Sequence, residues 1–291
     1  MPDNNRNKEL EALMNLLDEP NEDIFQTIRD RIFAHGKEAV SVLENTWENS
    51  FDPLIQHRIE DLIHQIQFDD LKKELHEWAE FGHHDLLQGA LLVTKFQYPD
   101  LDEESVIKKI GQFSQDVWLE LNKNLTGLEK VKVINHILFD SHNLAGNITN
   151  LNSAENFYIN HLLDTKKGSP LILGVIYISI AQGLRIPIYG VDLPRHFVLA
   201  YTDEIMISPG DIPEGDVLFY INPFNKGAVF TKNEIELFIK QLRLERKDDY
   251  FTPCNNKTII RRMINELINI FDQSGNPVKR DEMTELLSMI D

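Results

Sequence analysis

The sequence contains a single cysteine, Cys254, among its 291 residues. One cysteine allows neither an intramolecular disulfide nor a zinc site built from several thiolates. Any thiol chemistry of this chain therefore depends on Cys254 alone, and the position of that residue becomes a central question.

Basic residues are few beside acidic ones: 29 Lys and Arg stand against 47 Asp and Glu, a formal net charge of −18. This excess argues against non-specific nucleic-acid binding and against docking on anionic lipid. The longest apolar stretch, residues 170–184, includes Ser179 and Gln182 and is too short to cross a bilayer, so it predicts a buried core helix. The N-terminus lacks the pattern of a signal peptide. We expect a cytoplasmic protein that binds neither nucleic acid nor membrane.

Motifs for phosphates and metals are missing as well. Neither GxxxxGK[ST] nor GxGxxG occurs, and there is no HExxH. His76, Glu80 and His83 have offsets that would place them on one helix face, but Gly82 interrupts that helix. We therefore predict no metal site and no cofactor.

What is present divides the chain into three predicted sections, 1–100, 101–235 and 236–291. The first section carries 9 Lys and Arg against 21 Asp and Glu, so it holds −12 of the net charge. Its apolar residues recur at helical spacing throughout. Two similar units begin at Asp18 and Asp52, each a turn followed by an amphipathic helix. This section is predicted to be a helical, HEAT-like leader.

The middle section predicts helices first and strands afterwards, an α+β arrangement rather than a doubly wound sheet. A polar stretch at 141–156 is predicted to be a loop. The predicted helices cover 103–122, 127–140, 154–165 and 170–184, and the predicted strands cover 188–191, 196–201, 204–207, 217–221 and 228–230. The last section predicts helices at 232–246, 255–272 and 279–290, the final two forming a hairpin around a stop signal at 274–277.

Several phrases in the middle of the chain carry a resemblance to a known family. They are LFDSHNLAGN, NFYINHLLDTKKGSPLILGVIYISIAQGLRIPIYGVDLPRHFVLAY and YINPFNKG, in this order, followed by PCNNKTIIRRMINELINIF. This part of the sequence resembles the bacterial SirB-type branch of the transglutaminase-like superfamily. The resemblance implies a papain-like core, with a central helix and a small antiparallel sheet.

Active members of the wider superfamily place a Cys at the start of the central helix, a His on the next strand and an Asp on the strand after it. The helix start favours the thiolate, the His holds the proton and the acid orients the imidazole. By resemblance, His196 occupies the His position and Asn222 the acid position. The nucleophile position falls on Pro170, or on Ser169 if the alignment slips by one residue. Neither residue is a cysteine, so the resemblance implies a core without the catalytic thiol.

Each of these residues also has a plain structural interpretation. Ser169 followed by Pro170 is typical of a helix start, with Ser as N-cap and Pro in the first turn. Asn222 lies in Asn-Pro-Phe-Asn, a turn sequence. His196 heads a predicted strand, where a histidine is commonly a hydrogen-bonded structural residue. Cys254 lies in the lead-in to a predicted helix and is interpreted as a structural thiol.

Three hypotheses about function follow. The first is a non-catalytic transglutaminase-like protein that binds an unknown protein, peptide or ligand in a groove with His196 and Asn222. The second is a hydrolase or acyl-transferase that uses Ser169 with His196 and Asn222, which requires the hydroxyl within hydrogen-bond reach of the imidazole. The third is an adaptor that acts through its helical leader.

Overall fold

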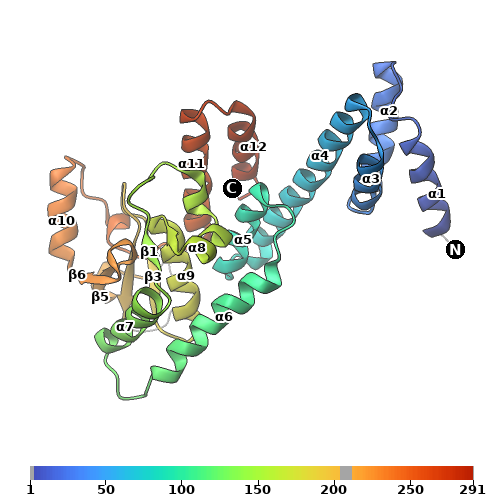
Figure 1. The fold of residues 1–291 in the computed structure, drawn as a ribbon. Coiled ribbons are helices and arrows are strands. Elements are labelled where there is room, and N and C mark those ends of the chain that lie inside the picture. The colour runs from blue at the N-terminus through green and yellow to red at the C-terminus, as the bar shows by residue number, and fades with distance from the viewer. Residues whose placement is uncertain (1–2, 204–211, 291) are drawn as a thin grey trace. The chain divides into compact units, whose positions relative to one another are not determined.

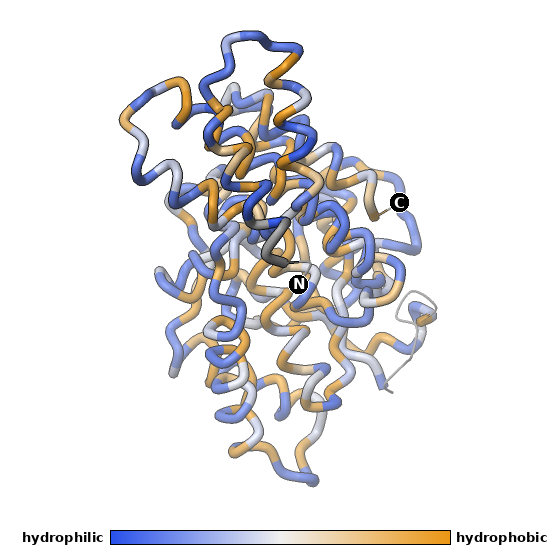
Figure 2. Tube along the Cα trace, turned by 90° about the vertical axis from the view of Figure 1, so that its right-hand side faces the viewer, coloured by the Kyte–Doolittle hydropathy of each residue, from blue (hydrophilic) through white to orange (hydrophobic). Residues whose placement is uncertain are grey.

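The computed structural model describes residues 3–203 and 212–290, so the predicted strand at 204–207 lies outside the described residues. Packing divides the chain into two compact units, Met1–Glu74 and Leu75–Asp291. The division of the chain into three domains stays a prediction, and the packing by itself separates two units. In both units the chain alternates between hydrophobic and hydrophilic positions, as amphipathic helices do (Figure 2).

The first unit is helical. It contains α1 (Asp3–Met14), α2 (Glu22–Phe33), α3 (Glu38–Asn49) and most of α4 (Pro53–Glu77). Asn21 caps α2 through its side-chain oxygen, which accepts from the backbone N–H of Asp23 at 3.0 Å. The helices share one core, formed by Leu10, Leu13, Met14, Leu17, Phe25, Ile28, Ile32, Ala39, Leu43, Ile59, Leu62 and Ile66. The prediction that the first section is helical is confirmed, while its HEAT-like character and its extent to residue 100 stay predictions.

The second unit combines helices with a sheet. Its α-helices are α5 (Leu86–Gln97), α6 (Glu103–Glu120), α7 (Gly127–Asn135), α8 (Ile159–Thr165), α9 (Pro170–Gly183), α10 (Lys232–Gln241), α11 (Asn256–Gln273) and α12 (Pro277–Ser288). The predicted helices at these positions are confirmed, except that the one predicted at 154–165 is divided into a 3-10 helix, Ala154–Phe157, and α8 because Tyr158 is extended. α10 ends before the predicted residue 246 because Arg243 has a left-handed φ of 55°, which a helix does not continue.

Four short strands form the antiparallel sheet that the sequence predicts. They are β3 (Ile188–Val191), β4 (Val198–Thr202), β5 (Val217–Asn222) and β6 (Ala228–Phe230), hydrogen-bonded in the order β3-β4-β5-β6. Leu199 pairs with Ile221, which fixes the register between the two central strands. The sequence misses a second pairing, in which β1 (Ala145–Gly146) lies parallel to β2 (Lys167–Gly168).

Helices cover both faces of the four-stranded sheet (Figure 1). α9 covers one face, where a Cβ on Gly174 would lie only 2.5 Å from the Phe197 ring and 3.4 Å from Leu199. α10 covers the other face, where Ile235 and Ile239 share a core with Val198, Ala200 and Tyr220. Successive strand residues point to opposite faces. Phe197 and Leu199 therefore pack against α9, and Val198 and Ala200 pack against α10.

α9 is the central helix, and the prediction of a buried core helix at 170–184 is confirmed. Ten of its residues are buried: Leu171, Ile172, Leu173, Gly174, Val175, Ile176, Tyr177, Ile178, Ile180 and Ala181. A helix that is apolar on all sides is stable only when other elements enclose it. Its one buried phenol, Tyr177, donates to Asn135 Oδ1 of α7 at 3.0 Å.

The C-terminal hairpin of α11 and α12 is confirmed. Gly275 takes a left-handed φ of 71° at the turn, which glycine adopts without steric cost. Asn276 then caps α12 by accepting from the backbone N–H of Lys279 at 3.2 Å, and Pro277 fills the first turn. Among the described residues, no helix has the length and apolar character that crossing a membrane requires.

Candidate functional site

The start of α9 is the position where the resemblance expects a nucleophile. Ser169 is 6% exposed, and its Oγ accepts a hydrogen bond from the backbone N–H of Ile172 at 3.2 Å. Its own backbone N–H donates to the carbonyl of Asn156 at 2.9 Å. Pro170 occupies the first turn, where a missing N–H costs nothing. The predicted N-cap is confirmed: the Ser169 hydroxyl oxygen accepts a hydrogen bond at the start of the helix.

The loop at 147–156 is fastened to this helix start. Asn147 donates from its backbone to the carbonyl of Gly168 at 2.9 Å and from its amide to Asn156 Oδ1 at 2.8 Å. The loop also exposes two aliphatic side chains, Ile148 at 78% and Leu151 at 60%. Two large apolar side chains therefore face solvent on a loop that is anchored beside Ser169.

His196 is placed differently from its prediction. It lies two residues before β4, because Arg195 adopts a left-handed φ of 62° and the chain turns there. The prediction that His196 heads a strand is therefore wrong. Its ring packs edge-on against Phe238 of α10, with 4.7 Å between ring centroids. Phe238 belongs to the helix that covers the sheet face opposite α9.

Arg262 of α11 holds the loop that carries His196. Its side chain is 13% exposed and donates to the Asp192 carboxylate, to the Leu193 carbonyl at 2.9 Å and to the His196 carbonyl at 3.3 Å. Burial, and after it the Arg262 charge, lowers the pKa of the His196 imidazole. Both causes favour the neutral ring.

Asn222 ends β5 and begins a short 3-10 helix, Pro223–Asn225. Its Oδ1 accepts from the backbone N–H groups of Phe224 at 3.1 Å and Asn225 at 3.2 Å. The predicted turn is confirmed, and the amide oxygen that would orient an imidazole is engaged in it.

The three positions belong to one region of the second unit without forming a hydrogen-bonded triad. A Cβ on Gly146 would lie 2.4 Å from the Phe224 ring, and Gly146 pairs with Gly168, so the Asn222 turn packs close to the start of α9. Within residues 3–203 and 212–290, no hydrogen bond joins Ser169, His196 and Asn222.

Cys254 lies beside the edge of the sheet. Its backbone N–H donates to the carbonyl of Gly190 in β3 at 2.8 Å. Burial of the thiol, and secondly the Asp192 carboxylate, raises the pKa of Cys254 to about 12. At neutral pH the sulfur is therefore a protonated thiol, which is a poor nucleophile.

His76, Glu80 and His83, the three possible metal ligands in the sequence, have other contacts. His76 Nδ1 lies 3.4 Å from the carbonyl of Met289, and Glu80 lies 3.9 Å from Lys257 Nζ. His83 is exposed, and its backbone carbonyl accepts from Asn256 at 3.0 Å. In the described part of the chain, no group of three or more His, Cys, Asp or Glu side chains could hold a metal ion.

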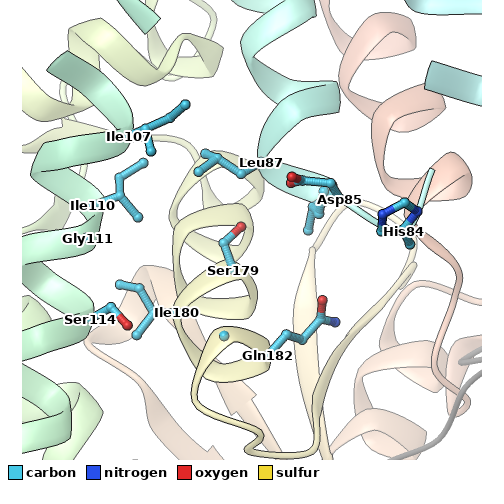
Figure 3. Close-up of a pocket in the computed structure, with 12 residues that line it drawn as sticks. His84, Asp85, Leu87, Ile107, Ile110, Gly111, Ser114, Ser179, Ile180 and Gln182 are labelled. Atoms are coloured by element: carbon cyan, nitrogen blue, oxygen red, sulfur yellow. The ribbon is translucent and has the colours of Figure 1, made fainter. Parts of the chain in front are cut away.

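The sequence misses a cavity at the other end of α9. It lies between α6, the start of α5 and the last turns of α9, and it has a volume of about 400 Å³ (Figure 3). Gly111 of α6 is the one signal that the sequence offers, since a glycine in the middle of a helix needs a reason. That Gly111 lines a cavity depends on how α6 packs against α5 and α9, which no local sequence pattern reveals.

The chain is similar in sequence to known proteins. The model of the transglutaminase-like superfamily matches residues 104–265, more than half of the chain. A UPF0162 protein of Xylella fastidiosa (strain Temecula1) is 27% identical over 192 residues, 64% of each chain. F-box only protein 21 of mouse is 24% identical over 213 residues, 73% of this chain and 31% of that protein.

A UPF0162 protein of Buchnera aphidicola (from Acyrthosiphon pisum) is 22% identical over 217 residues, 73% of this chain and 76% of that protein. The chain therefore spans slightly under two thirds of the Xylella protein and about a third of the mouse protein. No solved structure matches it.

Proposed function

We propose that this chain, which belongs to the transglutaminase-like superfamily, is a member of its SirB-type branch that acts by binding a protein segment and not by covalent catalysis. The observation that carries this proposal is the N-terminus of α9. Pro170 stands at the expected nucleophile position, and the neighbouring Ser169 hydroxyl caps the helix. We expect the protein in the cytoplasm and regard its first unit as a HEAT-like module.

A serine nucleophile requires an aligned base, because a neutral hydroxyl attacks poorly. Ser169 has no hydrogen bond to His196, whose ring instead packs on Phe238 of α10. Asn222, the residue that would orient the imidazole, caps a turn. These three arrangements support a site without acyl-transfer chemistry. The protonated Cys254 thiol supports it as well.

The surface proposed for binding consists of the exposed Ile148 and Leu151, and the resemblance adds the exposed residue His196, whose ring packs on Phe238 of α10. Exposed aliphatic side chains gathered at one place are typical of protein interaction sites. The loop that carries Ile148 and Leu151 is held by the hydrogen bonds of Asn147, so its backbone is anchored before a partner arrives. Such ordering reduces the entropic cost of association. The expected partner is a protein segment that contributes apolar side chains.

Photo-crosslinking from position 148 tests this proposal in cells that make the protein. A photoreactive amino acid at Ile148 should give a discrete crosslinked product, and the same group at exposed Lys108 on α6 should not. His196→Ala should reduce the product by about tenfold, the loss expected from roughly 1.4 kcal/mol. An unchanged product in His196→Ala would reject the surface centred on His196.

An adaptor function of the first unit is the second candidate, and one observation favours it. Phe51, between α3 and α4, is 95% exposed, and Leu54 beside it is 49% exposed. Aromatic side chains with this exposure are frequent anchors in interfaces. Phe51→Ser should remove partner binding if the leader is the adaptor and should leave the crosslink from position 148 intact if it is not.

A further inference from the structure

The cavity at the C-terminal end of α9 is lined by both aliphatic and polar side chains (Figure 3). Leu87 of α5, Ile107 and Ile110 of α6, and Ile180 of α9 supply the aliphatic surface. Its polar lining residues are His84, Asp85, Ser114, Ser179 and Gln182. A volume of about 400 Å³ lies within the range of small-molecule pockets, roughly 300 to 1,000 Å³.

Two glycines in the cavity wall have no packing reason to be glycine. A Cβ on Gly111, in the middle of α6, would meet no atom within 4 Å, and the same holds for Gly183 at the end of α9. Neither has a left-handed φ. Glycine inside a helix costs about 0.5 to 1 kcal/mol of stability relative to alanine. Gly111 therefore reduces the stability of α6, although a Cβ at this position would meet no neighbouring atom. Both glycines line the cavity and are exposed, so a side chain at either position would extend into open space beside the cavity.

The polar groups of the cavity remain available to a ligand. The side chains of Ser114, Gln182 and His84 make no hydrogen bond to the described residues. The Ser179 hydroxyl donates to the carbonyl of Val175 at 2.8 Å and retains its capacity to accept. In Figure 3 the Gln182 amide extends toward the side where Asp85 and His84 lie.

Asp85 decides which charge the cavity favours. It caps α5 by accepting from the backbone N–H of Gln88 at 3.0 Å, so it already compensates the positive end of that helix. Among the lining residues in the described part of the chain, Asp85 is the only Asp, Glu, Lys or Arg. An anionic ligand would meet this carboxylate without a Lys or Arg among the described lining residues, whereas a neutral or cationic head group would not be repelled.

We propose that this cavity binds a small molecule with a short aliphatic body and a neutral or cationic polar head, such as an alcohol or a primary amine. The aliphatic body lies against Ile107, Ile110 and Ile180, and the head group meets Ser114, Gln182 and Asp85. The site is separate from the surface around Ser169, because the 14 residues of α9 hold the two about 20 Å apart at 1.5 Å per residue.

Three probes with one chain and different heads test the proposal: 1-hexanol, hexylammonium and hexanoate. Each is titrated into the full-length protein while the methyl NMR signals of Ile107, Ile110 and Ile180 are followed. The proposal expects saturable shifts of these signals with hexanol and hexylammonium and at least about tenfold weaker binding of hexanoate. Absence of saturable shifts with the first two, or equal binding of hexanoate, would overturn it.

Cavity-filling variants locate the binding. Gly111→Leu places a side chain in the open volume and should weaken hexanol binding by about tenfold or more, while Gln112→Leu, on the exposed neighbouring position of α6, should leave it unchanged. Gly183→Leu fills the cavity from the opposite wall and serves if Gly111→Leu does not fold. Wild-type affinity in a folded cavity-filling variant would contradict the assignment.

Discussion

The two ends of α9 differ in what their polar groups do. At the N-terminal end, the side-chain oxygens of Ser169 and the nearby Asn222 accept hydrogen bonds from backbone N–H groups of the protein itself. At the C-terminal end, Ser114 and Gln182 face an open cavity with no hydrogen bond to the described residues. The position that the resemblance assigns to the nucleophile is therefore occupied by a helix cap, and the cavity described above lies at the other end of α9.

The largest expected effect concerns the Cys254 thiol. Because burial raises the pKa of Cys254 from 9.0 to about 12, the native thiolate fraction at pH 8 is about a thousandfold lower than in the unfolded chain. Iodoacetamide should therefore alkylate native Cys254 about a thousandfold more slowly than urea-unfolded protein, as followed by intact mass. Equal rates would show that the thiol is accessible and ionised.

The same shift has a consequence for stability. The folded pKa of Cys254 lies above the unfolded one, so its contribution to stability is present below pH 9 and is lost as pH rises from about 9 to 12. Cys254→Ala should flatten the fall in the free energy of unfolding over this alkaline window.

Arg262→Met should lower the free energy of unfolding by about 2 to 3 kcal/mol, because three oxygens of the 192–196 loop lose a charged donor. It should also raise the pKa of His196, since the charge of Arg262 is one of the two causes that depress it. Urea unfolding and NMR titration of the imidazole measure the two effects. An unchanged pKa of His196 with lowered stability would assign Arg262 a role in stability alone.

Alanine at two glycines sharpens the comparison, because the expected effects have opposite signs. Gly174→Ala forces a Cβ to 2.5 Å from the buried Phe197 ring and should destabilise the protein by about 1 to 3 kcal/mol. Gly111→Ala meets open space and should stabilise it by about 0.5 to 1 kcal/mol. Denaturant unfolding of both variants tests whether one end is closed and the other open.

Two serines of α9 give the smallest expected effects. Ser169→Ala removes the N-cap and should cost about 1 kcal/mol. Ser179→Ala removes only a hydroxyl that donates back to Val175 within the helix and should change stability by less than about 0.5 kcal/mol. If the two variants lose equal stability, the capping function of Ser169 is not distinctive.

Local sequence patterns predict the helices, the small sheet and the caps, because these depend on neighbouring residues. Ser169 and Asn222 follow capping and turn preferences, and both act as such in the structure. The pattern wrongly predicts that the strand begins at His196. Arg195 adopts a left-handed φ, and β4 begins only at Val198. The β1–β2 pairing escapes it too, since two residues with a distant partner carry no periodic signal.

The cavity and the positioning contact of Arg262 depend on packing between elements far apart in sequence. Arg262 lies 66 residues beyond the His196 carbonyl that it contacts. Gly111 and Gly183 become informative only when α6 and α9 are seen to face one volume. The helix cap at the start of α9, by contrast, is predictable from the phrase that contains Ser169 and Pro170, because Ser followed by Pro is typical of a helix start.

The most direct test of the central claim is the mass of the protein after incubation with p-nitrophenyl acetate, with peptide mapping of any acetyl group. Acyl transfer through Ser169 would form an ester on its Oγ with release of p-nitrophenol. We predict no acetyl group on Ser169 and the same slow release of p-nitrophenol from wild type and His196→Ala. An acetyl group on Ser169 that disappears in His196→Ala would contradict the account and identify the start of α9 as a working active site.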